Sequence, residues 1–124
     1  MIGTQGLTHI HLMVRDLDRS VAFYTRVFGL EERFREGHHM VFLNTPGSQD
    51  LITLNEDPDE AEVAGLNGGV NHFGFRLTEV SALDAAVAEV EAAGGTLVKR
   101  GEHASGVPFA YIRDPDGYLI EMLP

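Results

Sequence analysis

Three residues far apart in the chain, His9, His72 and Glu121, have the side-chain types that bind a divalent metal. Two imidazoles and one carboxylate can occupy one face of a metal ion and leave the other positions open for substrate or oxygen. Such a set suits Fe(II), and also Mn(II), Ni(II) or Zn(II). The separations of 63 and 49 residues exclude a local motif, so the fold must bring the three together.

Other histidines compete for the same role. His11 follows His9 by two residues, so on a strand it points to the same side. His38 and His39 fall in a predicted loop or hairpin, where an exposed position without a function is the simpler interpretation. Isolated histidines are more often surface or core residues than ligands, so residue types alone leave the metal set open.

Composition excludes several classes of function. The chain has no cysteine, which rules out disulfides, thiolate catalysis and zinc-thiolate sites. Nine Lys and Arg against 19 Asp and Glu give a net charge of −10, which disfavours nucleic acid as a partner and tolerates a cationic ligand. No apolar run is long enough to cross a bilayer and no signal peptide is recognisable, so we expect a cytoplasmic protein without membrane contact.

The elements that must position these residues begin with a strand over residues 9–14. Its alternation puts Ile10, Leu12 and Val14 on one face and His9 and His11 on the other. Helical spacing of apolar residues, an N-cap at residues 16–18 and a C-terminal stop at Gly29 predict a helix from Leu17 to Phe28. Strands are expected next at residues 32–35, 40–44 and 51–55.

The second half repeats this order. A strand over residues 70–77 places His72 on the face opposite Phe73 and Phe75, and a helix over 80–93 ends at Gly94 and Gly95. Strands are expected at residues 96–100, 109–113 and 118–123, with a turn at 114–117 between the last two.

An internal duplication of about 63 residues explains the repeat. We therefore predict one α+β domain over residues 1–124, made of two βαβββ modules at about 7–55 and 70–124 with a connector at 56–69. Each half is too small to be stable alone, so the modules should join into one curved mixed sheet around a concave metal site. His9, His72 and Glu121 fall on the concave face by strand parity.

Three segments resemble the vicinal oxygen chelate superfamily: LTHIHLMVRDLDRSVAFYTRVFGL at residues 7–30, VNHFGF at 70–75 and DPDGYLIE at 114–121. This superfamily includes glyoxalase I, fosfomycin-modifying enzymes, bleomycin-binding proteins and extradiol dioxygenases. The resemblance covers nearly the whole chain and implies that His9, His72 and Glu121 are the metal ligands, while His11 lines the pocket. It also implies a small-molecule substrate and a homodimer, with the modules paired within a chain or exchanged between chains.

Two members of the superfamily fit less well. Glyoxalase I has a fourth ligand, a glutamate on the fourth strand, where this chain has Thr53, and a hydroxyl is a poor substitute for a carboxylate that moves protons. Fosfomycin enzymes carry basic residues beyond the last ligand, but only three residues follow Glu121 here. A glyoxalase-like isomerase or lyase and a thiol transferase on the same site remain alternatives.

The extradiol dioxygenases share a C-terminal signature that this chain resembles at His103, Tyr111, residues 114–117 and Glu121. The signature implies that Tyr111 hydrogen-bonds a substrate oxygen with His103 nearby, although both could be ordinary strand and loop residues. Ala110 replaces a larger aliphatic residue, and the usual acid-base histidine is absent after the fourth strand.

We therefore predict an extradiol-type dioxygenase that uses Fe(II) on a catechol-like substrate, with His103, Tyr111 and His11 as catalytic residues. The alternative of another class is a bleomycin-type binding protein, which would have no need of the three ligands.

Overall fold

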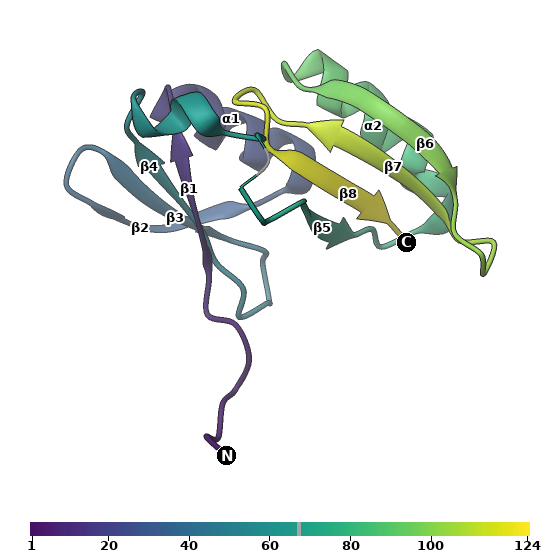
Figure 1. Ribbon diagram of the computed structural model, residues 1–124, viewed down its shortest axis with the longest axis horizontal. Coiled ribbons are helices and arrows are strands. Elements are labelled where there is room, and N and C mark those ends of the chain that lie inside the picture. Colours follow the sequence, from purple (N-terminus) through teal and green to yellow (C-terminus); the bar gives the residue numbers. More distant parts are fainter. Residues whose placement is uncertain (67) are drawn as a thin grey trace.

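The computed structural model describes residues 1–66 and 68–124, residue 80 by its backbone alone. The first module consists of β1 (Ile10–Val14), α1 (Leu17–Phe28), β2 (Glu31–Glu36), β3 (Met40–Asn44) and β4 (Ile52–Glu56). Its sheet has the order β1-β4-β3-β2, with β1 parallel to β4 and the other pairs antiparallel. The first nine residues extend away from the sheet (Figure 1).

The second module repeats this arrangement. It contains β5 (Phe73–Arg76), the short 3₁₀ turn η2 (Val80–Ala82), α2 (Leu83–Ala92), β6 (Thr96–Glu102), β7 (Pro108–Arg113) and β8 (Leu119–Leu123). The sheet order is β5-β8-β7-β6, with β5 parallel to β8. Figure 1 shows both helices behind the strands, on the same side of the two sheets. The predicted α+β fold of two βαβββ modules is confirmed.

Helix α1 begins and ends where the sequence predicts. The Asp16 side chain accepts a hydrogen bond from the Arg19 N–H at the first turn, and Gly29 adopts a left-handed conformation with φ of 66°. Helix α2 has no capping side chain and is preceded by the 3₁₀ turn η2, so the predicted helix over residues 80–93 is regular only from Leu83. A further 3₁₀ turn, η1 (Glu60–Val63), lies in the connector, which the sequence did not predict.

The two modules share one hydrophobic core between helices and sheets. Leu12, Val14, Leu54, Ile112 and Ile120 from both modules are almost completely buried in it. Phe28 of α1 stacks on Phe75 of β5 with ring centroids 3.9 Å apart, which ties the modules together. Among the described residues, no helix is long and apolar enough to cross a membrane.

The sheets remain separate in the single chain. Each hydrogen-bonded sheet contains the four strands of one module, and no ladder joins β1 to β5 in the part of the chain that the structure describes. The one continuous curved sheet expected from the sequence is therefore not formed, because β1 and β5 are both edge strands whose outer edges do not pair with each other. Beside the shared hydrophobic core, polar side chains form a second connection between the modules.

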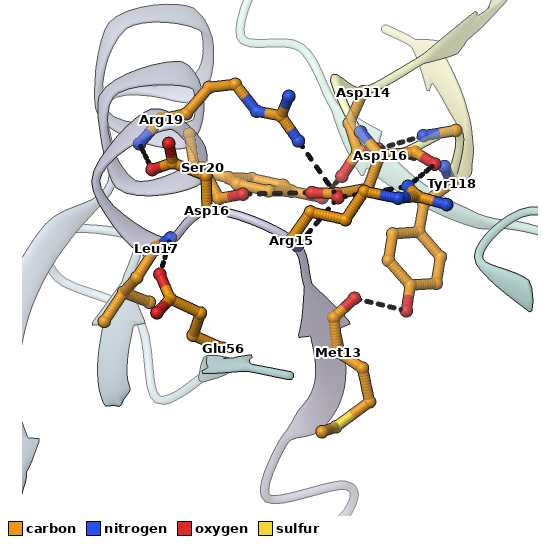
Figure 2. Close-up of polar contacts among 12 residues, drawn as sticks. Met13, Arg15, Asp16, Leu17, Arg19, Ser20, Glu56, Asp114, Asp116 and Tyr118 are labelled. Atoms are coloured by element: carbon orange, nitrogen blue, oxygen red, sulfur yellow. Dashed lines mark hydrogen bonds and ion pairs between the residues drawn. The ribbon is translucent and has the colours of Figure 1, made fainter. Parts of the chain in front are cut away.

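That connection is a cluster around Asp116, in the turn between β7 and β8, which we call the inter-module clasp (Figure 2). The buried Asp116 carboxylate accepts hydrogen bonds from the Arg15 backbone at 2.9 Å, from Arg19 at 3.1 Å and from Ser20 at 3.1 Å. Its neighbour Asp114 accepts one from the Tyr24 hydroxyl at 2.8 Å. The clasp thus fixes the end of β1 and the start of α1 against the turn that precedes β8.

Candidate metal centre

Glu121 is the meeting point of the candidate site. It lies on β8 between the buried Ile120 and Met122, so its side chain points to the face opposite the helices. In the ladders it pairs with Tyr111 of β7 on one side and Gly74 of β5 on the other. Because Gly74 has no side chain, the carboxylate is approachable from the β5 side; a Cβ there would lie 3.6 Å from the Cβ of Glu121.

His72 faces this carboxylate from the residue before β5. Its Nε2 atom lies 3.4 Å from Glu121 Oε2, and its ring meets the Tyr111 ring edge-on with centroids 4.9 Å apart. The other ring nitrogen, Nδ1, lies 2.7 Å from Asn71 Oδ1. An amide oxygen accepts hydrogen bonds, so Nδ1 carries a hydrogen, and in the neutral ring Nε2 is then the nitrogen whose lone pair a metal would use.

His103 approaches the other oxygen of the same carboxylate. Its Nε2 atom lies 2.8 Å from Glu121 Oε1. The residue sits just after β6, at the tight turn into β7, where its N–H donates to the Val107 carbonyl and its own carbonyl accepts from Gly106. The ring packs against Phe109 with centroids 4.6 Å apart. The hairpin turn therefore holds His103 at the site.

Tyr111 completes the cluster from β7. Burial raises the pKa of the Tyr111 hydroxyl, and the charge of the adjacent Glu121 raises this pKa further. The phenol therefore keeps its proton at neutral pH and can donate a hydrogen bond. Four of the residues singled out from the sequence thus converge within the second module: His72, His103, Tyr111 and Glu121.

The structure does not bring His9 and His11 into the same contacts. His9 is exposed just before β1, with Nδ1 2.8 Å from Thr8 Oγ1, and borders a hollow shared with Phe73 and Gly74. His11, also exposed, lines a neighbouring cavity together with His72. Within the described residues, no group of three or more potential ligands has the geometry of a metal site. The assignment of His9 therefore stays a prediction.

The remaining candidates lie elsewhere. His38 and His39 are exposed in the turn between β2 and β3, and His39 Nδ1 lies 3.9 Å from a carboxylate oxygen of Glu56. Thr53, at the position of the glyoxalase fourth ligand, is fully buried, and its hydroxyl has no hydrogen-bond partner among the described residues. An enclosed hydroxyl of this kind is a poor candidate for coordinating an exchangeable metal.

The ligand types at Glu121 fit a divalent metal by their chemistry. The His72 Nε2 atom faces a carboxylate of which 13% is exposed, and imidazole and carboxylate are ligand types that Fe(II), Mn(II) and Zn(II) accept. Asn71, which contacts His72 Nδ1, was not singled out by the sequence analysis. The sequence does offer a cue to Asn71, because it directly precedes His72. In the first module, Thr8 precedes His9 in the same way.

A duplicated βαβββ fold with histidines and a terminal glutamate on its open face defines a class of metal-binding scaffold. The chain belongs to the Glyoxalase/Bleomycin resistance protein/Dioxygenase superfamily, whose family model matches residues 6–122. The resemblance to the vicinal oxygen chelate superfamily drawn from the sequence is thereby confirmed.

The curated relatives carry different activities in their names. A probable lactoylglutathione lyase of Vibrio cholerae is 30% identical, with 98% of this chain and 92% of the relative covered. The metallothiol transferase FosB of Shouchella clausii is also 30% identical, with coverage of 94% and 78%. A catechol-2,3-dioxygenase of Bacillus subtilis is 32% identical over 93% of this chain but only 41% of its own length. These relatives support the family without selecting one reaction.

Solved structures agree on the fold. The genomically encoded fosfomycin resistance protein FosX of Listeria monocytogenes superposes with a TM-score of 0.77 at 25% sequence identity. The match covers 99% of this chain and 93% of that one.

Proposed function

We propose that this protein is a metal-dependent enzyme that opens a catechol-like ring with dioxygen, with His9, His72 and Glu121 as the metal ligands. The observation that carries the proposal is the convergence of His72, His103 and Tyr111 on the Glu121 carboxylate. Bound Fe(II) would act as a Lewis acid that lowers the pKa of the substrate hydroxyls, and as a route for electrons to oxygen.

The protein's own residues would orient the substrate. Tyr111 donates a hydrogen bond to one substrate oxygen, and His103 lies beside that oxygen with its imidazole held by Glu121. In the overall reaction one ring C–C bond next to the hydroxyls breaks, and both atoms of dioxygen end in the product. The ring supplies the four electrons that reduce dioxygen, so no further reductant is required.

The proposed ligand set requires His9 to reach His72 and Glu121. Two features favour a homodimer as the assembly in which this happens. The outer edges of β1 and β5 form no ladder with each other in the described chain, and Leu7 and Val70, near the two histidines, are largely exposed apolar residues. Sedimentation velocity of the metal-loaded protein tests this part; a monomer with a fully occupied metal site would refute it.

The second candidate is a lyase or isomerase of the glyoxalase type, or a thiol transferase. The names of the Vibrio cholerae and Shouchella clausii relatives favour it, and they match more of their own length than the dioxygenase does. Thr53 argues against the glyoxalase reaction because its buried hydroxyl cannot move protons as a carboxylate does.

The reaction class is tested by oxygen uptake. Protein loaded with Fe(II) under anaerobic conditions should consume oxygen when a catechol is added. Tyr111→Phe should slow turnover by roughly ten- to a hundredfold at unchanged metal content, since about 1.4 kcal/mol of transition-state stabilisation corresponds to tenfold in rate. Absence of uptake with a panel of catechols and hydroquinones would refute the dioxygenase, and isomerisation of a hemithioacetal would establish the second candidate.

A further inference from the structure

A cavity of about 740 Å³ adjoins the candidate metal centre between the two modules. Its walls come from β1, from the connector with η1, and from the residues that begin β5 and β8. His11 and His72 are its imidazoles, so the cavity reaches the site from the β1 side. This volume lies within the range of small-molecule sites and far exceeds what a single six-membered ring needs.

The part of the connector over residues 57–65 is held in place by contacts with both modules. The Asp57 N–H donates to the Val14 carbonyl at 3.0 Å, and Ala61 is fully buried. Gly65, with φ of 72°, lies so close to Gly117 that a Cβ would meet the Gly117 carbonyl oxygen at 1.9 Å. Across the cavity, the Tyr118 hydroxyl donates to the Met13 carbonyl at 2.8 Å and links the modules. The cavity is therefore a built feature of the chain.

Among the described residues, the lining of the cavity contains carboxylates but no Lys or Arg. Asp59 and Glu60 line the cavity, and neither carboxylate forms an ion pair within the described residues. An anion entering here would lose hydration and meet the negative charges of Asp59 and Glu60, which are both exposed, so their repulsion is strongest at low salt. The apolar residues Val63 and Leu66 are 66% exposed at the wall, so they offer surface that an apolar ligand would cover.

We infer that this cavity selects uncharged, largely apolar small molecules with hydroxyls at the His72 end, and that Asp59 and Glu60 reject anionic analogues. The placement of the ligand hydroxyls at the His72 end rests on the proposed function, whereas the rejection of anionic molecules does not. Under this inference the substrate is a neutral catechol with an apolar substituent packed against the connector, rather than a carboxylate- or phosphonate-bearing compound.

The test compares protocatechuate with its methyl ester, which share the catechol ring and differ in the negative charge. Binding is measured by NMR titration of metal-free protein, following the backbone amides of Val63, Leu66 and Tyr118. The ester should bind at least about tenfold more tightly than the acid. Glu60→Lys should strengthen binding of the acid about fivefold at low salt and leave the ester nearly unchanged.

The matched control is Glu62→Lys, the same charge reversal in the same 3₁₀ turn at an exposed residue outside the cavity lining. It should leave both affinities unchanged. Equal affinity for the acid and the ester in the wild type, or equal effects of the two Lys variants, would overturn the inference. So would a dimer whose cavity amides respond to neither probe, since the cavity would then be an interface. Because the titration needs no metal, its failure is distinct from loss of the proposed enzyme activity.

Discussion

At the scale of single residues, the orientation of the histidines decides whether the site can bind metal. Asn71 Oδ1 lies 2.7 Å from His72 Nδ1, and Thr8 Oγ1 lies 2.8 Å from His9 Nδ1. The two modules therefore repeat not only a histidine but also a polar side chain at its Nδ1 atom, although the Asn71 oxygen can only accept a hydrogen bond whereas the Thr8 hydroxyl can also donate one. Groups that orient a metal-binding histidine typically contribute ten- to a hundredfold to metal affinity.

Asn71→Ala should therefore weaken metal binding by about ten- to a hundredfold without unfolding the protein, because Asn71 is exposed. The affinity is measured by competition with a chromophoric chelator. Asn71→Asp retains an acceptor for Nδ1 and is the matched control, so it should bind metal nearly as the wild type does. Equal affinity of the Ala variant and the wild type would show that the Asn71 contact has no part in the site.

Thr53 gives a second prediction at this scale. Its buried hydroxyl has no partner among the described residues, and a buried polar group without a hydrogen bond costs about 1–3 kcal/mol. Thr53→Val keeps the shape and removes that group, so the free energy of unfolding in urea should rise by about 1 kcal/mol with unchanged metal content. Loss of metal in this variant would instead make Thr53 part of the site.

At the scale of elements, the inter-module clasp sets how β1 lies relative to β8. Asp116→Ala leaves the Arg15 N–H and the Ser20 hydroxyl without their acceptor, and should lower the free energy of unfolding by about 2–4 kcal/mol. Arg15→Ala and Arg19→Ala should each lower the free energy of unfolding by less than about 1 kcal/mol, because the two side chains are 38% and 44% exposed.

The control is Asp18→Asn, which changes an exposed acid on α1 outside the clasp. Denaturation in urea gives all four values; a smaller loss for Asp116→Ala than for Arg15→Ala would contradict the role of the clasp.

The elements themselves were largely predictable from the sequence. Helix α1 and strand β3 have the predicted bounds because capping residues and turn residues mark both ends. Strand β5 begins at Phe73 rather than Val70, since its neighbour β8 pairs only with Phe73–Arg76, and pairing length is a tertiary property. The 3₁₀ turn in the connector begins after Asp57, whose side chain accepts hydrogen bonds from the Asp59 and Glu60 N–H groups. Asp57 and Pro58 were therefore a local start signal that the sequence analysis did not use.

The candidate site was predictable in part for a similar reason. Strand parity and the resemblance located His72, His103, Tyr111 and Glu121, which the second module brings together. The distance of His9 from them depends on how the open edges of β1 and β5 are arranged, and no local pattern encodes that. The separation of the two sheets could not be predicted for the same reason.

At the scale of the whole molecule, the buried acid Asp114 links stability to pH. Burial raises its pKa above the usual 3.8, and the hydrogen bond from Tyr24 offsets only part of this. An acid whose pKa is higher in the folded state stabilises the fold fully below its unfolded pKa, and loses that contribution as the pH rises through the folded value. Wild-type protein should therefore gain stability relative to Asp114→Asn as the pH falls from 7 to about 4.

This difference is measured by urea denaturation of both proteins across that pH range. Comparing the two cancels the contribution of the other carboxylates, which is large in a chain of charge −10. If the difference in stability does not vary with pH, or if the variant becomes the more stable protein at low pH, then the pKa of Asp114 is not raised in the folded protein.

We propose that one divalent metal binds where His72 and Glu121 face each other, with His9 as the third ligand. Metal content and affinity of protein purified without chelators and reloaded with Fe(II) test it most directly. His9→Ala, His72→Ala and Glu121→Ala should each lose most of the metal, because one missing ligand leaves an incomplete set, while His11→Ala and His103→Ala should retain it. Wild-type occupancy in the Glu121→Ala or His72→Ala variant would show that the metal does not bind there, and loss of metal in His103→Ala with retention in His9→Ala would move the third ligand into the second module.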